Sequence, residues 1–281
     1  MKISVSFSGG RTSAYMGWWL KHHTDHDLKF IFMNTGCEHE KTLEFLNECD
    51  TRWGLNLIWV EAVVNHAGRG YGFGTRHRTV NFETAARVGE PFEDSIKKYG
   101  IPNAGAPNCS MHLKEEPLKS YMRENHMGDW VNAVGIRSDE VDRINPNHKQ
   151  HGLVYPLIDM HPTTENDIMH WWSRQDFDLQ LKQFQGNCSW CWKKSFRKLT
   201  AIAQTEPELF EFPARMEAKY PHKGQTKEMA ARTFFRANKT TQEVLAMAKD
   251  NIPFNPSPVT QPDMFWDETG GCSESCEVFS E

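Results

Sequence analysis

A short glycine-rich segment near the start of the chain has the residue types of a phosphate-binding loop. It reads Ser8-Gly9-Gly10-Arg11-Thr12-Ser13 and lies between a run with strand character, 3–7, and a run with helical character, 12–22. Paired glycines let the chain turn sharply, and the amides at the start of a helix can hold an anion. Three hydroxyl groups and a guanidinium add donors. The segment has neither the Walker spacing nor that of a dinucleotide loop, and an ordinary glycine-rich turn is the alternative.

A second set of side chains has the chemistry of metal ligands. Cys188 and Cys191 form a C-x-x-C pair, and Cys109 with His112 repeats the same spacing. Together the four have the spacing of a closed structural zinc site. Buried thiols are the alternative, because cysteine often packs as a small apolar residue. The chain has seven cysteines, an odd number, and no export signal, so a disulfide framework is not expected.

Basic and aromatic side chains gather around the C-x-x-C pair and in an upstream glycine-rich run. No acidic residue occurs between 182 and 198. The residues concerned are Arg69, Tyr71, Phe73, Arg76, Arg78, Lys182, Trp190, Trp192, Lys193, Lys194, Arg197 and Lys198. Such a set can bind a polynucleotide backbone and stack bases. The net charge of −5, from 32 basic and 37 acidic side chains, favours a solvated helix face and a clamp for a small nucleotide instead.

These motifs need a scaffold, and the first half of the chain alternates β-rich runs with helical patterns. Strands are expected over 3–7, 28–33, 57–64, 130–134 and 153–155, and helices over 12–22, 41–53 and 113–125. The alternation predicts an α/β fold with a parallel, Rossmann-like sheet flanked by helices. Beyond Cys191 the pattern is mostly helical, over 196–220 with a break at Pro213, then 226–238 and 241–249.

Three regions are expected along the chain. A nucleotide-binding α/β domain spans 1–181, with a mobile basic insertion at 65–108 where the periodicity fails. A C-x-x-C and helical region follows over 182–251, and a loosely held tail over 252–281. No apolar run reaches the roughly 18 residues of a membrane span, and the N-terminus has no signal-peptide pattern. The expectation is a cytoplasmic protein without a membrane partner.

The first loop resembles the pyrophosphate loop, S-G-G-x-D-S, of the adenine nucleotide α-hydrolase superfamily. The neighbouring stretches resemble its phosphoadenosine phosphosulfate (PAPS) reductase family. The segment Asn34-Thr35-Gly36-Cys37-Glu38 is similar to N-T-G-x-E, 109–117 to C-T-x-x-L-K-x-x-P, and 135–143 to G-x-R-x-x-E-S-x-R, with the C-x-x-C segment following in order. The resemblance runs from 6 to about 191, roughly two thirds of the chain.

The chain departs from the family pattern at two places. Thr12 stands where the loop usually has an aspartate, and the tail has no E-C-G-x-H, the motif that carries the nucleophilic cysteine of thioredoxin-linked reductases. The Gly-Gly-Cys tail and the compact C-x-x-C look more like family members of phages and mobile elements. An ordinary assimilatory PAPS reductase is therefore not expected.

The resemblance implies a site for ATP or a PAPS-type nucleotide, with Mg²⁺ as a companion that the sequence leaves open. The residues that would hold the nucleotide are Ser8, Gly9, Gly10, Arg11, Thr12, Ser13, Asn34, Thr35, Gly36 and Glu38. Those that would neutralise charge developing on its phosphates are Lys114, Arg137 and Arg143.

The resemblance also implies that Cys109 joins Cys188 and Cys191 at the strand ends. Three cysteines can hold a [4Fe–4S] cluster with one open iron, which we prefer to the zinc site that includes His112. Cys272 or Cys276 in the tail could supply a fourth ligand.

The function predicted on this basis is a sulfur-transfer enzyme, a transferase or reductase, that uses ATP or an adenylyl-sulfate nucleotide. An ATP-dependent thiolase acting on tRNA or DNA is one alternative. A nucleotide-binding or sensing module without turnover is another, because the loop acid and the catalytic tail motif are missing. The sulfur donor or acceptor and a homo-oligomeric state are left open.

Overall fold

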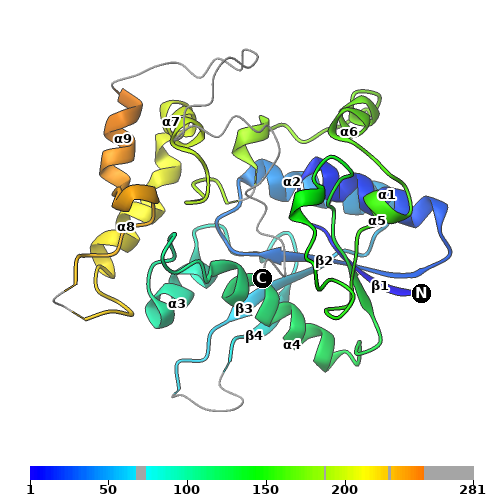
Figure 1. The fold of residues 1–281 in the computed structure, drawn as a ribbon, viewed down its shortest axis with the longest axis horizontal. Helices are drawn as coiled ribbons and strands as arrows, with labels where there is room; N and C mark the ends of the chain where they lie inside the picture. Colours follow the sequence, from blue (N-terminus) through cyan, green and yellow to red (C-terminus); the bar gives the residue numbers. More distant parts are fainter. Residues whose placement is uncertain (68–73, 187, 227–228, 250–281) are drawn as a thin grey trace.

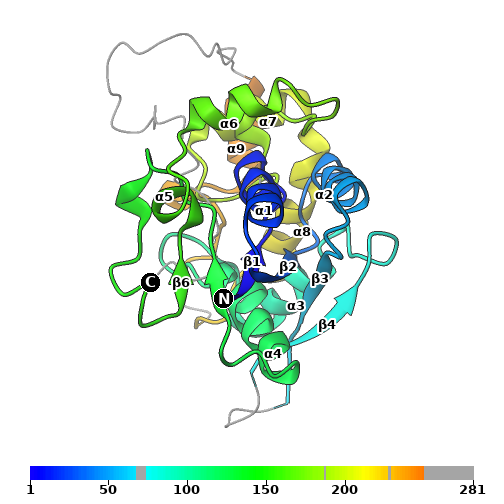
Figure 2. The same ribbon diagram turned by 90° about the vertical axis from the view of Figure 1, so that its right-hand side faces the viewer.

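A six-stranded sheet organises the computed structural model, which describes residues 1–67, 74–186, 188–226 and 229–249. The strand order is β4-β3-β2-β1-β5-β6 (Figures 1 and 2). The strands are β1 (Lys2–Ser6), β2 (Asp27–Asn34), β3 (Ile58–Val63), β4 (Arg76–Val80), β5 (Val131–Ala133) and β6 (Leu153–Val154). Every pairing is parallel except that of β3 with β4. The predicted α/β fold with a parallel sheet is therefore confirmed.

Helices cover both faces of the sheet. On one face lie α1 (Arg11–His23) and α2 (Glu40–Trp53), and on the other α3 (Glu90–Tyr99) and α4 (Glu116–Glu124), as Figure 2 shows. The short α5 (Pro156–Asp159) and α6 (Glu165–Trp172) pack beside α1. To one side of the sheet in Figure 1 stand α7 (Phe196–Thr205), α8 (Glu211–Lys219) and α9 (Thr241–Lys249). Single helical turns of other types occur at Met111–Glu115, Val141–Arg143, Gln183–Gln185, Pro207–Phe210 and Arg236–Asn238.

The alternation of side chains in β1 explains its position. Ile3, Val5 and Phe7 are buried in the core that contains α1. Ser4 and Ser6 alternate with them and bind the amide oxygen of Asn132 in β5. Burying an aliphatic or aromatic side chain of this size stabilises the fold by about 1.5–3 kcal/mol. These contacts hold β1 in the middle of the sheet, and the loop that begins at Ser8 lies just beyond the carboxyl end of the strand.

A second core joins the C-terminal helices to α3. The ring of Trp190 stacks on Phe212 with centroids 5.4 Å apart, and Phe92 of α3 packs against both. Cys37, which follows β2, belongs to the same cluster. The helical region after residue 182 thus shares a core with the segment 65–108.

The described part of 65–108 differs from the expected loop, because it contains β4 and α3. In β4 the sequence Arg-His-Arg-Thr-Val forms an edge strand with no alternation of apolar residues, so the period-2 signal is missing. In α3 only Phe92 and Ile96 supply a large buried apolar side chain. Residues 68–73, which include Arg69, Tyr71 and Phe73, and the tail with Cys272 and Cys276 lie outside the described residues.

The helix predicted over 226–238 is wrong for the residues described there. Residues 231–233 have no helical structure, and the chain has a single helical turn at Arg236–Asn238. Phe234 and Phe235 are consecutive and both buried, and the amide of Phe234 donates to Glu217 instead of to a helical carbonyl. The helix break expected at Pro213 lies earlier, at Pro207, since Pro213 is accommodated in the first turn of α8.

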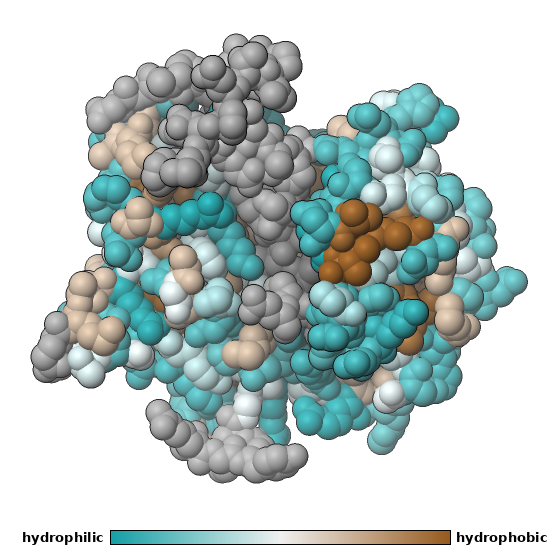
Figure 3. Space-filling view, viewed as in Figure 1, coloured by the Kyte–Doolittle hydropathy of each residue, from teal (hydrophilic) through white to brown (hydrophobic). Residues whose placement is uncertain are grey.

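No helix in the described parts of the chain is long and apolar enough to cross a membrane. Outside the grey atoms, the face in Figure 3 is mainly hydrophilic, with one small group of strongly hydrophobic side chains at its right. That visible face carries no broad apolar surface.

Candidate functional site

The glycine-rich loop connects β1 to α1 and leaves the start of the helix uncapped. Gly10 is the N-cap residue, and no side chain accepts from the first helical amides there. Ser13 Oγ instead accepts from the amide of Ser8 at 3.1 Å and donates to the carbonyl of Gly10 at 3.0 Å. Uncapped amides at a helix start, together with the helix dipole, favour an anion.

Gly9 is required by the loop's contact with α2. Its φ is +85°, and a Cβ there would lie 2.5 Å from Thr42 Cγ2. An L side chain would both strain the backbone and clash. The loop is therefore packed against the body of the protein, which holds its amides in place.

A cavity of about 140 Å³ lies in front of the loop, at the carboxyl ends of β1 and β5. The loop and the segment after β5 form two of its walls. Its lining residues are Ser8, Gly10, Arg11, Thr12, Ser13, Val134, Gly135, Arg137, Glu140, Arg143, Glu165, Ile168, Met169, Leu179, Lys182 and Gly186. Of the predicted nucleotide residues, the structure thus brings five loop residues together with Arg137 and Arg143.

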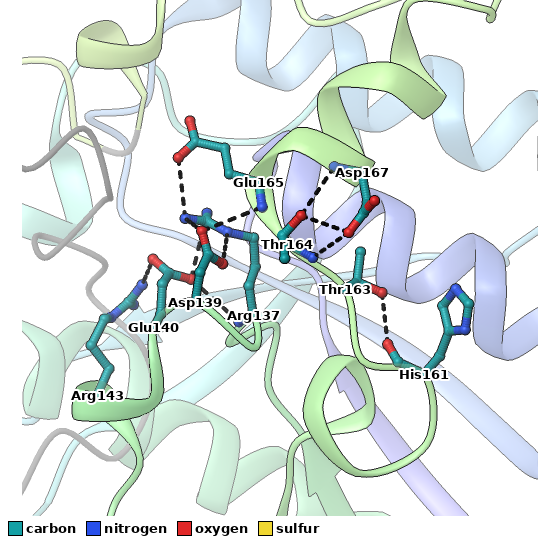
Figure 4. A network of polar contacts seen from close by, with 9 residues as sticks. All are labelled: Arg137, Asp139, Glu140, Arg143, His161, Thr163, Thr164, Glu165 and Asp167. Carbon is teal, nitrogen blue, oxygen red and sulfur yellow. Dashed lines mark hydrogen bonds and ion pairs between the residues drawn. The ribbon is translucent and has the colours of Figure 1, made fainter.

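The two arginines on the far wall are held by carboxylates (Figure 4). Arg137 Nε is 2.9 Å from Asp139 Oδ1, and Arg137 Nη1 is 3.4 Å from Glu140 Oε2. The other oxygen of Glu140 binds Arg143 Nη1. Glu165 Oε2, from the start of α6, lies 3.4 Å from Arg137 Nη2. Glu140 therefore lies between the two arginines and orients both guanidinium groups.

Burial strengthens this network. Arg137 is 6% exposed and Glu140 5%. Burial alone would raise the pKa of Asp139, but the hydrogen bond and charge of Arg137 outweigh it and hold that pKa below its ordinary value. Asp139 is thus ionised at neutral pH, and its carboxylate lies against the guanidinium of Arg137 in the wall of the cavity.

The segment after β2 forms a separate polar cluster. The amide of Thr35 and its hydroxyl both donate to Glu38, at 3.0 and 2.8 Å. Burial raises the pKa of Glu38, and the charge of Lys114 opposes that rise, which places Lys114 beside this carboxyl group. Asn34 donates to the fully buried Glu61 at 2.6 Å. Among the described residues, neither this segment nor Lys114 lines the cavity in front of the loop.

The predicted cysteine ligands are all buried in the second core. Cys109, Cys188 and Cys191 belong to one hydrophobic cluster with Cys37, and Cys188 Sγ is 3.5 Å from Thr35 Oγ1. Burial raises the pKa of the Cys37 thiol well above its ordinary value, and the neighbouring Cys188 raises it further. The buried ammonium of Lys194 donates to the carbonyls of residues 186, 188 and 189, at 2.8 to 3.1 Å, and so supports the C-x-x-C turn from within.

His112 does not extend this group. Its ring stacks on Tyr99 with centroids 3.5 Å apart, and its Nδ1 binds Glu116 Oε2 at 2.9 Å. In the ranges that the structure covers, no group of three or more His, Cys, Asp or Glu side chains is arranged to hold a metal ion. The four thiols therefore share one buried cluster, without the arrangement of a metal site among the described residues.

Sequence reasoning missed two acidic residues that hold arginines of the site. Glu140 stands inside the G-x-R-x-x-E segment, so its spacing from Arg137 was a usable signal. Asp178 binds Arg11, with Arg11 Nε 2.7 Å from Asp178 Oδ1. Arg11 and Asp178 are far apart in the sequence, so no local sequence pattern connects them.

Comparison with known proteins agrees with this architecture. The phosphoadenosine phosphosulfate reductase domain matches residues 2–180, and the chain belongs to that family. It is 33% identical to the nin region protein ORF290 of Escherichia phage lambda, over 98% of this chain and 94% of that protein. The predicted likeness to a phage member is therefore confirmed.

Two archaeal proteins of Methanocaldococcus jannaschii are similar over shorter stretches. MJ0973 is 27% identical over 74% of this chain and 46% of its own length. MJ0066 is 28% identical over 49% of this chain and 23% of its own length. The similarity thus spans less than half of each archaeal protein.

Proposed function

We propose that this protein binds an adenine nucleotide by its phosphates at the loop 8–13 and uses it in a sulfur-transfer reaction. The observation that carries the proposal is the uncapped start of α1 facing a cavity whose opposite wall bears Arg137 and Arg143. Amide donors on one side and guanidinium groups on the other are the complement of an anionic phosphate chain. Membership of the PAPS reductase family supports a nucleotide as the ligand.

The residues would act in distinct ways. The amides after Gly10 and the hydroxyl of Thr12 would bind phosphate oxygens, since the hydroxyls of Ser8 and Ser13 already donate within the loop. Arg137 and Arg143 would neutralise charge that develops there when ATP transfers its adenylyl group to an oxygen and pyrophosphate leaves. Lys114 does not line the cavity, and it would neutralise phosphate charge from its position in the polar cluster around Glu38. With an adenylyl-sulfate nucleotide the same donors would hold its phosphates.

The experiment that tests this function measures binding first and turnover second. ATP and PAPS are titrated against the full chain by calorimetry, and pyrophosphate release from ATP is assayed with tRNA, DNA and small acceptors. Release of sulfite from PAPS with a dithiol reductant tests the reductase form. Pyrophosphate release only with tRNA or DNA would favour the thiolase alternative, and tight ATP binding without turnover the sensing module. Failure of ATP and PAPS to bind would contradict the proposal.

The iron–sulfur cluster on Cys109, Cys188 and Cys191 stays a proposal with its own test. Anaerobically purified protein is analysed for visible absorbance, iron, sulfide and zinc, beside Cys188→Ser and, as a control distant from this group, Cys49→Ser. Iron and sulfide that are lost only in Cys188→Ser would support the cluster. A colourless protein with stoichiometric zinc would contradict it.

A further inference from the structure

Arg11 is the only loop residue whose side chain carries a full positive charge, yet its guanidinium is bound by the protein itself. Its Nε and Nη2 donate to the two carboxylate oxygens of Asp178 at 2.7 and 2.8 Å. Nη1 donates to the carbonyl of Leu181 at 3.3 Å, and Nη2 also to that of Leu179. Four of the five guanidinium N–H groups are thus engaged by one short segment.

That segment, 172–182, forms a wall of the candidate nucleotide cavity. Leu179 and Lys182 line the cavity, and Leu179 and Leu181 are buried in the core that contains α1. Its first residue is tied to the loop as well, because the indole of Trp172 donates to the carbonyl of Arg11 at 3.1 Å. The segment has no regular secondary structure from 176 to 180. Its position therefore depends on side-chain contacts such as these.

We propose that Arg11 and Asp178 form a clamp that holds segment 172–182 against the phosphate loop, with Asp178 as a positioning residue and Arg11 not a phosphate ligand. A bidentate pair between guanidinium and carboxylate fixes geometry as well as charge. The carboxylate of Asp178 also cancels most of the positive charge that Arg11 would otherwise offer a phosphate. This inference rests on the proposed nucleotide site.

The alternative role makes the opposite prediction for one substitution. If Arg11 bound phosphate directly, Asp178→Asn would release the guanidinium and remove a nearby negative charge, so ATP would bind as tightly as before or more tightly. If the pair is a clamp, the same change loosens the wall and weakens ATP binding. Arg11→Ala weakens binding in both cases, so Asp178→Asn is the informative variant.

The test compares Arg11→Ala, Asp178→Asn and the double variant by ATP calorimetry on the full chain. The clamp predicts that each single change raises the Kd roughly tenfold, as expected for loss of charge-assisted hydrogen bonds, and that the double variant is no weaker than either. Asp176→Asn is the matched control, since Asp176 lies in the same segment but binds Arg52 at 2.8 Å on the exposed surface. Unchanged or tighter ATP binding by Asp178→Asn would overturn the clamp.

Hydrogen exchange separates this inference from the function it rests on. Without nucleotide, the amides of 173–182 should exchange faster in Arg11→Ala and in Asp178→Asn than in the wild type or in Asp176→Asn. Wild-type protein that binds no adenine nucleotide would defeat the proposed function, while the exchange result would still report on the clamp. Equal exchange in all four proteins would overturn the clamp whatever the nucleotide result.

Discussion

Replacing Gly10 by aspartate should abolish nucleotide binding and leave the fold intact. Gly10 has φ −92° and ψ 159°, which any L residue can adopt. A Cβ at this position would meet only Ser8 Oγ, at 3.9 Å. Aspartate is a preferred N-cap residue, and its carboxylate would accept from the amides of the first helical turn. Those are the amides that we propose for phosphate binding.

The size of the effect follows from charge and distance. A carboxylate at the N-cap would lie about 4 Å from a phosphate at the loop, where two like charges repel by about 4 kcal/mol at an effective dielectric constant of about 20. This corresponds to a Kd about 1,000-fold higher. Exchanging glycine for aspartate at an N-cap changes stability by only a few tenths of a kcal/mol. The melting temperature should therefore shift by about 1 °C.

The assay is ATP calorimetry alongside thermal unfolding, with Gly10→Asn as the matched control. Asparagine caps the helix equally well without a charge, so it should weaken ATP binding much less than aspartate does. A folded Gly10→Asp protein that binds ATP with wild-type affinity would refute the placement of the site. Equal weakening by asparagine and aspartate would instead refute the electrostatic reasoning.

Three further predictions concern stability. Glu140→Gln should lower the free energy of unfolding in urea by about 1–3 kcal/mol, because Arg137 and Arg143 lose the carboxylate that they share; an unchanged urea midpoint would count against the network. Gly89→Ala should lower the free energy of unfolding by about 2 kcal/mol or more, since φ at this position is +89° and a Cβ would lie 2.1 Å from Phe212 Cε2. A urea midpoint equal to that of the wild type would disprove the clash. The hydroxyl and amide of Thr164 donate to Asp167 and hold its pKa below the ordinary value. The carboxylate therefore stabilises the fold above about pH 4, its pKa in the unfolded chain. This stabilisation is lost as the pH falls through the pKa of Asp167 in the folded protein. Urea midpoints from pH 6 to 3 should accordingly fall less in Asp167→Asn than in the wild type, and parallel curves would argue against this linkage.

Much of the fold could be predicted from the sequence because its signals are local. The alternation of apolar residues with serines in β1, the apolar run of β2 and the helical period of α2 each depend on neighbouring residues. The edge strand β4 and helix α3 could not be predicted in this way. Their stability comes from pairing with β3 and from packing against Trp190, which is far away in sequence.

The sequence by itself determined the glycine-rich loop, since two adjacent glycines between a strand and a helix are sufficient to predict a turn with exposed amides. It also determined the family motif that contains Arg137, Glu140 and Arg143. Only the tertiary structure decided that Arg11 binds Asp178 and that the ring of His112 stacks on Tyr99. The type of a residue limits which hydrogen bonds its side chain can make. Its actual partner depends on which chain segment folding brings within about 3 Å.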